Sequence, residues 1–354
     1  SSTNCWPRPS DPYGQHRFRH ARESRTLPIH VLLNCVGDPI PMFTEAGVAA
    51  EDVIVTPNAT HLAIADLHRL IHGSTAILAP LTLKVDGKFL DAAGSSLKVI
   101  ANYAVGVDNI DLEACAARGV TVCNGPPPMV EPTADIAWAL LIATARRLRE
   151  GIRLAESGDW NGYDPQLLLG HRLHRGTLLV VGAGRIGAAV ARRSIGWEMR
   201  VLYTARSRKP NLEVPPISAT KVTLEEGLPL ADAVVLTISL EQSTRHLIDA
   251  AAISLMKPTS VLVNVSRGPV VDESALATAL IEGRILGAGL DVHEHEPAIE
   301  PRLLECPNVT VLPHIGSATF EDRLDLTRLS VRNISAVLAG RKPPHEVASP
   351  DPSP

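Results

Sequence analysis

The chain has 354 residues, which is enough for two domains because a single hydrophobic core rarely extends beyond about 250–300 residues. Its 45% apolar and 20% charged residues are typical of a globular protein, and a net charge of −4 favours neither a nucleic-acid nor a membrane partner. No apolar run reaches the ~18 residues needed to cross a bilayer. The five scattered cysteines form no C-x-x-C pair, which argues against a disulfide framework and indicates a reducing compartment.

Residues 1–27 are polar, proline-rich and basic, without the apolar segment of a secretory signal. We expect them to form a disordered extension of a cytoplasmic protein, with an organellar transit peptide as the alternative. Residues 348–354 are expected to form a tail.

Short apolar segments alternate with helical patterns from residue 29 onward, which predicts βαβ units and a parallel sheet. Strands are predicted over 29–33, 76–79, 98–101 and 119–123, and helices over 66–72 and 112–118. Three prolines at 126–128 then interrupt regular structure, and one long helix is predicted over about 133–149. We expect a domain boundary at this break.

A second α/β region follows the break. Several of its predicted strands are apolar throughout, as in strands buried on both faces. They cover 178–181, 199–203, 233–237, 260–265, 285–288 and 309–312. An amphipathic helix is predicted from about 317 to 340.

The glycine motif after the first of these strands is the most informative stretch of the chain. Gly182, Gly184 and Gly187 form a G-x-G-x-x-G pattern between a predicted strand and a helix over 188–195. In this pattern the glycines permit a tight turn, close approach of a pyrophosphate and close helix–strand packing, while the helix N-terminus attracts phosphate. The motif therefore predicts dinucleotide binding.

The loop after the next strand indicates which dinucleotide is bound. An NAD-selective site would place an acidic residue about 20 residues past the glycines, but Ala205 stands there. Arg206, Ser207 and Arg208 follow it, and guanidinium groups bind phosphate through charge-assisted hydrogen bonds. We therefore predict NADP(H) as the preferred cofactor, with NAD(H) as the second choice. The alternative interpretation is a solvated basic loop without a ligand.

Several blocks occur in the order typical of one family, and the chain resembles the D-2-hydroxyacid dehydrogenases, especially their glyoxylate/hydroxypyruvate reductase branch, over about 31–347. Besides the glycine motif, the blocks are 102–109 (NYAVGVDN), 264–272 (NVSRGPVVD), 287–292 (GAGLDV), 296–297 (EP) and 313–319 (PHIGSAT).

Reduction of a 2-keto acid needs a cation for the carboxylate, an acid for the carbonyl oxygen and a nicotinamide in place. Arg267 lies in a turn just past a predicted buried strand, where ligands bind in α/β folds, and its guanidinium suits a carboxylate. His314 also follows a strand, and histidine can donate a proton near pH 7. The resemblance makes Arg267 the substrate arginine and makes Glu296 the partner that keeps His314 protonated.

The resemblance implies further contacts. Leu81, Val105 and Gly106 correspond to substrate-binding positions, the last two through backbone amides. Thr133 and Asp291 correspond to positions that line the nicotinamide, although Asp291 alternatively caps a strand end. The other positions implied to contact the cofactor are Arg185, Ile186, Thr237, Val265, His314 and Gly316.

The chain departs from the family pattern at three places. His293 replaces the usual aromatic residue, which gives the sequence HEHE over 293–296. A metal site there is the alternative, but a mechanism with a side-chain acid requires none, and we predict no metal. Ser239 replaces a proline near the expected adenine pocket, and Tyr163 stands where relatives place a tryptophan that reaches the partner subunit.

Together these features predict a Rossmann-like dinucleotide domain, 131–314, inserted into a substrate domain formed by 28–130 and 315–347. We expect an NADP(H)-dependent reductase of a small 2-keto acid that forms a homodimer through the dinucleotide domain. The alternatives are a dehydrogenase of another small anion, such as phosphite, and a nucleotide-sensing, corepressor-like scaffold of the same fold.

Overall fold

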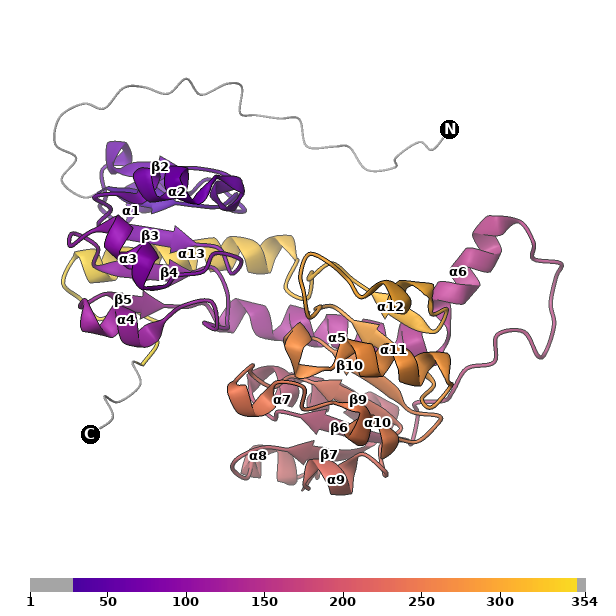
Figure 1. The fold of residues 1–354 in the computed structure, drawn as a ribbon. Coiled ribbons are helices and arrows are strands. Elements are labelled where there is room, and N and C mark those ends of the chain that lie inside the picture. The colour runs from indigo at the N-terminus through magenta and orange to yellow at the C-terminus, as the bar shows by residue number, and fades with distance from the viewer. Residues whose placement is uncertain (1–27, 349–354) are drawn as a thin grey trace.

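The computed structural model describes residues 28–348, which form two lobes, each built on a parallel sheet flanked by helices (Figure 1). The predicted α/β class with two parallel sheets is confirmed. The expected N-terminal extension and tail residues 349–354 lie outside the described residues. Within 28–348, no helix combines the length and the hydrophobicity needed to cross a bilayer.

The first lobe contains a five-stranded sheet of order β2-β1-β3-β4-β5. Its strands are β1 (Ile29–Val31), β2 (Val53–Val55), β3 (Ala76–Ala79), β4 (Val99–Asn102) and β5 (Thr121–Cys123). Its helices are α1 (Pro39–Glu45), α2 (Ile64–Ile71), α3 (Gly87–Ala93), α4 (Leu112–Ala117) and the chain's last helix, α13 (Phe320–Leu338). Helix α13 returns from the end of the second lobe to pack against α1, β4 and β5.

The second lobe contains a seven-stranded sheet of order β12-β11-β10-β9-β6-β7-β8. Its strands are β6 (Thr177–Val181), β7 (Arg200–Thr204), β8 (Thr220–Lys221), β9 (Ala233–Leu236), β10 (Val261–Asn264), β11 (Gly287–Leu290) and β12 (Val309–Val311). Its helices are α5 (Val130–Ala145), α6 (Leu148–Ser157), α7 (Arg185–Arg193), α8 (Pro210–Glu213), α9 (Leu224–Gly227), α10 (Ala250–Ser254), α11 (Glu273–Ile281) and α12 (Pro301–Glu305).

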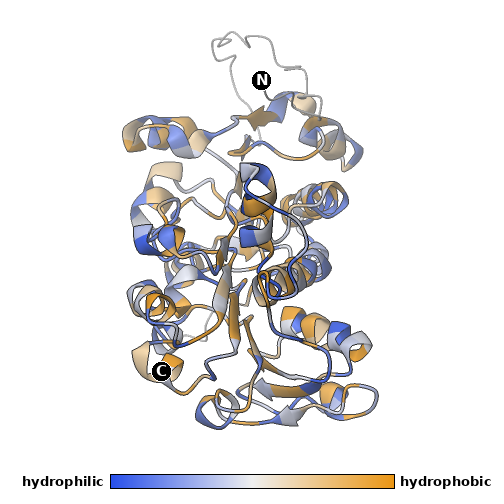
Figure 2. Cartoon of the chain, turned by 90° about the vertical axis from the view of Figure 1, so that its right-hand side faces the viewer, coloured by the Kyte–Doolittle hydropathy of each residue, from blue (hydrophilic) through white to orange (hydrophobic). Residues whose placement is uncertain are grey.

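Apolar side chains fill both faces of each sheet. Strand β9 is buried along its whole length: Val235 points into the cluster that contains Leu140 of α5, and Val234 into the cluster that contains Leu276 of α11. Figure 2 shows these hydrophobic strands between helices whose outer surfaces carry hydrophilic residues. Burial on both faces explains why the predicted strands lack apolar–polar alternation.

The prediction of a single helix over 133–149 is wrong, because the chain forms α5 and α6 with a break between them. The backbone of Arg147 adopts a left-handed conformation with φ of 53°. Returning residue His171 donates its backbone N–H to the Ala145 carbonyl at 2.9 Å and so occupies the C-terminus of α5. This long-range contact ends α5, and α6 leaves the body of the lobe (Figure 1).

Strand β11 begins two residues later than the predicted 285–288. The prediction missed its start because the glycines of β11 weaken the sequence pattern of a strand. A Cβ atom on Gly289 would lie 2.8 Å from the Cβ of Leu140, and one on Gly287 would lie 2.4 Å from the Asn308 carbonyl. Glycine therefore lets α5 and the chain before β12 approach β11 closely.

Candidate active site

The predicted site residues of the second lobe follow the carboxyl ends of six parallel strands. Since parallel strands all end at one edge of a sheet, the glycine motif after β6, Ala205 after β7, Thr237 after β9, Arg267 after β10 and Glu296 after β11 share that edge, as does His314 after β12. Strands β7 and β9 flank β6 on opposite sides, so the glycine motif lies where the strand order reverses, the usual ligand position in such sheets.

The three glycines of the motif meet different surroundings. Gly182 has a φ of 96°, and Gly187 packs so closely that a Cβ would lie 2.3 Å from the Gly182 carbonyl. A Cβ on exposed Gly184 would meet no atom within 4 Å. The turn is thus tightly packed at Gly182 and Gly187 but accessible at Gly184, where α7 begins. Exposed Arg185 and half-buried Ile186 follow. This shape fits a dinucleotide pyrophosphate.

Thr237 supports the same turn from β9, because its hydroxyl donates to the Gly182 carbonyl at 2.7 Å. Val265, which directly follows β10, is buried. These two residues shape the edge without exposing a charged group.

A cavity of about 470 Å³ lies beside the basic loop after β7. Arg206 lines it with a 92% exposed side chain, and so does Lys221 of β8, which sequence reasoning missed. Arg208 binds Glu213 through forked hydrogen bonds of 2.6 and 3.1 Å. Ser207 is exposed and accepts a hydrogen bond from Lys209 at 3.4 Å. The cavity can hold the adenosine end of a dinucleotide with two cations beside it.

Arg267 connects the two lobes. Its Nε and Nη2 contact the Asp108 carboxylate in the loop after β4 at 3.0 and 2.9 Å, while Nη1 donates to the Ser266 carbonyl at 2.9 Å. A Cβ on Gly106 would lie 2.0 Å from Nη2, so only glycine leaves room for this guanidinium. Asp108 was visible in its sequence block, but its pairing with Arg267 requires the fold.

Side-chain hydrogen bonds from two asparagines hold the loop that contains Val105 and Gly106. Asn124 donates to the Val105 carbonyl at 2.6 Å, and Asn102 donates to the Gly106 carbonyl at 2.7 Å. Half-buried Leu81 lies in the turn after β3, and the loop follows β4, which pairs with β3 in parallel. Three sequence-predicted substrate positions therefore lie at one edge of the first sheet.

Glu296 and His314 form a hydrogen-bonded pair. The His314 Nδ1 lies 2.9 Å from Glu296 Oε2, and the His293 backbone N–H donates to Glu296 Oε1 at 3.0 Å. Burial alone would raise the pKa of Glu296, but the hydrogen bond and charge of His314 outweigh it, so the pKa lies below its ordinary value. An ionised carboxylate orients the imidazole, and Nε2 remains to exchange a proton with a ligand.

Asp291 holds the turn that carries His314. Its carbonyl accepts the His314 N–H at 2.8 Å, and its carboxylate accepts the N–H groups of Ile315 and Gly316 at 2.8 and 2.7 Å. His314 has a φ of 55°, a conformation that is uncommon outside glycine and that these bonds maintain. Burial raises the Asp291 pKa, against these amide bonds and His314. Asp291 therefore caps the strand ends.

Thr133 approaches the same turn from α5, since a Cβ on Gly316 would lie 2.7 Å from the Asp291 carboxylate and 3.5 Å from the Thr133 methyl group. The HEHE cluster does not converge: His293 is buried, whereas His295 is exposed. Across residues 28–348, no group of three His, Cys, Asp or Glu side chains is arranged to hold a metal ion.

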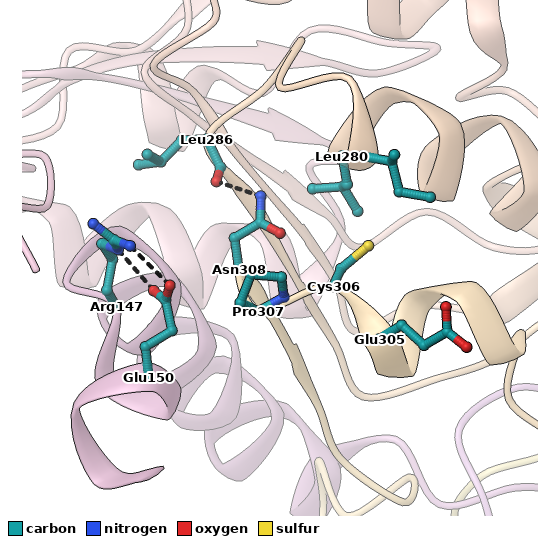
Figure 3. A pocket seen from close by; sticks show the side chains of 9 residues that line it. Arg147, Glu150, Leu280, Leu286, Glu305, Cys306, Pro307 and Asn308 are labelled. Atoms are coloured by element: carbon teal, nitrogen blue, oxygen red, sulfur yellow. Dashed lines mark hydrogen bonds and ion pairs between the residues drawn. The ribbon is translucent and has the colours of Figure 1, made fainter. Parts of the chain in front are cut away.

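A second cavity, of about 500 Å³, lies at the opposite edge of the second sheet (Figure 3). Leu286 and Asn308, which precede β11 and β12, line it together with the Arg147–Glu150 ion pair at the start of α6. Because none of the predicted catalytic residues lies there, this cavity is not the candidate active site.

Comparison with known proteins agrees with this geometry. Residues 138–316 match the family model described as D-isomer specific 2-hydroxyacid dehydrogenase, NAD binding domain. The chain belongs to this family of oxidoreductases.

The relatives are more specific. A protein named glyoxylate reductase from Thermococcus onnurineus is 45% identical over 273 residues, which cover 76% of this chain and 81% of the relative. A glyoxylate reductase structure from Paecilomyes thermophila has a TM-score of 0.81 at 29% identity and covers 91% of this chain and 99% of that one. The NADPH-dependent glyoxylate/hydroxypyruvate reductase of Sinorhizobium meliloti, solved with NADP and malonate, has a TM-score of 0.78 at 32% identity and covers 92% and 98%.

Proposed function

We propose that this protein reduces a small 2-keto acid of the glyoxylate or hydroxypyruvate type, with NADP(H) as the preferred cofactor and NAD(H) as the second choice. The observation that carries the proposal is that Arg267 and the Glu296–His314 pair share one sheet edge with an open glycine turn. The names of the relatives from Thermococcus and Sinorhizobium support the substrate class.

Each side chain of the site has a separate role in the proposed reaction. Arg267 binds the substrate carboxylate, together with backbone amides of Val105 and Gly106, and Leu81 contacts the rest of the small molecule. His314 donates a proton from Nε2 to the carbonyl oxygen, while Glu296 stabilises the imidazolium. A bound nicotinamide dinucleotide, lined by Thr133, would supply the hydride, while Asp291 holds the turn that carries His314.

Closure of the two lobes would exclude water from this chemistry. The Arg267–Asp108 ion pair spans the lobes at the point where the substrate binds, so it couples substrate binding to lobe position.

We further propose a homodimer that forms through α6 and the segment after it. Helix α6 has no buried residue, and apolar side chains along it and beyond are exposed, including Ile152 (57%), Trp160 (60%) and Leu169 (64%). Figure 1 shows α6 extending away from the second lobe. Such an apolar surface on a projecting helix is typical of a subunit contact.

Substitution of Arg267 tests the activity. We expect R267A to reduce glyoxylate and hydroxypyruvate at least about 100-fold less efficiently in kcat/KM, mainly through a higher KM, because a charge-assisted carboxylate contact is lost. Initial rates of NADPH oxidation measure the effect. The matched control is R284A, which removes an arginine before β11 at the opposite sheet edge and should leave the rate unchanged.

Near-normal kinetics of R267A would refute the proposal. Turnover of phosphite, but not of 2-keto acids, by the unmodified protein would favour the other-anion dehydrogenase. NADP(H) binding without turnover of any tested anion would favour the corepressor-like scaffold.

A further inference from the structure

His293 is a buried histidine between three segments of the proposed active site. It follows β11, its side chain is 3% exposed, and its Nε2 lies 2.9 Å from the carbonyl oxygen of Leu312, two residues before His314. Its Nδ1 faces Glu273, the first residue of α11, at 3.6 Å. Gly268, next to Arg267, packs on its backbone so closely that a Cβ there would lie 1.9 Å from the His293 carbonyl.

The partners of the ring determine its protonation. A carbonyl oxygen can only accept a hydrogen bond, so Nε2 must carry a proton. In a neutral ring, Nδ1 would then present a lone pair to the Glu273 carboxylate, which has no donor to offer when ionised. This unfavourable contact disappears when the ring is an imidazolium, since Nδ1 then directs an N–H at the Glu273 carboxylate, while Nε2 keeps its hydrogen bond to the Leu312 carbonyl.

Glu273 needs the same arrangement. Its side chain is 5% exposed, and a buried carboxylate is costly without a counter-charge. It accepts the Glu294 backbone N–H at 3.1 Å. In the described part of the chain, His293 is the one basic side chain within ion-pair distance of Glu273.

The charges around His293 alternate in sign. Glu273 reaches it from α11, and its own loop brings Glu296, which binds the His293 backbone, as well as Asp291 and Glu294. His314, after β12, lies on the far side of Glu296. Burial lowers the His293 pKa, but the nearby Glu273 carboxylate, the hydrogen bond to the Leu312 carbonyl and the charge of Glu296 outweigh it, so the pKa lies above its ordinary value.

We propose that His293 is a buried, permanently protonated positioning residue that fixes the proton donor pair of this enzyme. Its charge adds to that of His314 in favouring the ionised form of Glu296, and its Nε2 hydrogen bond connects the β11 loop to the chain that carries His314. The charge sequence is therefore Glu273, His293, Glu296, His314, from the interior to the substrate. This inference rests on the proposed catalytic role of Glu296 and His314.

Ring protonation is measured without reference to activity. The full chain is labelled with ¹⁵N-histidine, and the ring nitrogens are observed at about pH 8, where ordinary histidines are neutral. We expect an imidazolium signal, with both nitrogens protonated, that is absent in H293Q. If the signal that H293Q removes comes from a neutral ring, the proposal is overturned.

Kinetics test the positioning role. Glutamine can still donate to the Leu312 carbonyl but lacks the charge, so H293Q separates the hydrogen bond from the electrostatic effect. We expect H293Q to lower kcat by up to about 100-fold and to move the acid-side loss of activity to higher pH, because Glu296 becomes easier to protonate. The exposed neighbour variant H295Q should match the unmodified protein in both respects.

A pH profile of H293Q that coincides with the unmodified profile would contradict the role, even if the rate falls. If H293Q does not fold, E273Q serves instead, and loss of the imidazolium signal at pH 8 is the expected result. If R267A shows that the proposed activity is wrong, the NMR measurement still decides whether His293 is a cation.

Discussion

At the scale of single residues, the cations near the basic loop differ in how they are paired. Arg208 is held by Glu213, which also accepts a hydrogen bond from the Tyr203 hydroxyl. Arg206 makes only a 3.6 Å contact with Glu241, and Lys221 contacts the Arg206 carbonyl at 3.4 Å. The two loosely held cations are therefore better placed for the ribose 2′-phosphate of NADPH than Arg208 is.

We expect the R206A/K221A double variant to raise the KM for NADPH at least about 100-fold, since each hydrogen bond to a charged group contributes roughly 1.5–3 kcal/mol. The KM for NADH, which has no 2′-phosphate, should stay within about twofold. R208A is the matched control and should change the NADPH value less than about threefold. Steady-state rates with both nucleotides provide the measurement, and a larger effect of R208A would show that its pair with Glu213 opens on binding.

Residue types indicated the proposed site chemistry, but their partners required the fold. The two arginines of the loop could be predicted as phosphate ligands because no carboxylate stands at position 205. That Glu213 holds Arg208, and that Lys221 joins from a two-residue strand, depends on β7–β8 pairing, for which two residues leave no detectable period. The same holds for Asp108, whose partner is 159 positions away.

At the scale of elements, the β6–α7 turn separates packing from ligand binding. Gly187 is in close contact with the turn below it, whereas Gly184 faces open space. Two substitutions of the same size should therefore have different consequences.

We expect G187A to destabilise the protein by about 1–3 kcal/mol through overpacking, or roughly 2–12 °C in Tm. G184A should change Tm by less than about 2 °C yet weaken NADPH and NADH binding alike, because the pyrophosphate is common to both. Thermal unfolding and nucleotide titration distinguish the two variants. Equal losses of Tm in G187A and G184A would refute the separation of packing from ligand binding in this turn.

Element positions were predictable where burial makes the pattern strong. Strand β3 has the predicted bounds, and β12 and β9 each differ by one residue at one end. The failures have long-range causes: His171 ends α5, and contacts with Leu140 select glycines in β11. Neither cause leaves a local signal in the sequence.

At the scale of the whole molecule, the proposed homodimer would bury the exposed apolar side chains of α6. We expect I152D to convert dimers into monomers at micromolar concentration, because a carboxylate would be buried in an apolar contact. Sedimentation velocity measures the change. I64D is the control, since Ile64 is 73% exposed but lies on α2 of the first lobe. A monomeric unmodified protein would refute the dimer.

Helix α13 has a further consequence during synthesis. Its Leu326 and Ile334 complete the apolar cluster that contains Val31 and Val99, yet it leaves the ribosome about 200 residues after β5. At roughly 5–20 residues per second, this delay lasts about 10–40 s. The second lobe is continuous in the chain and can fold meanwhile, whereas in the first lobe one face of the sheet is covered only in part, by α1, until α13 emerges. The nascent chain is therefore most prone to aggregate through the part that was made first.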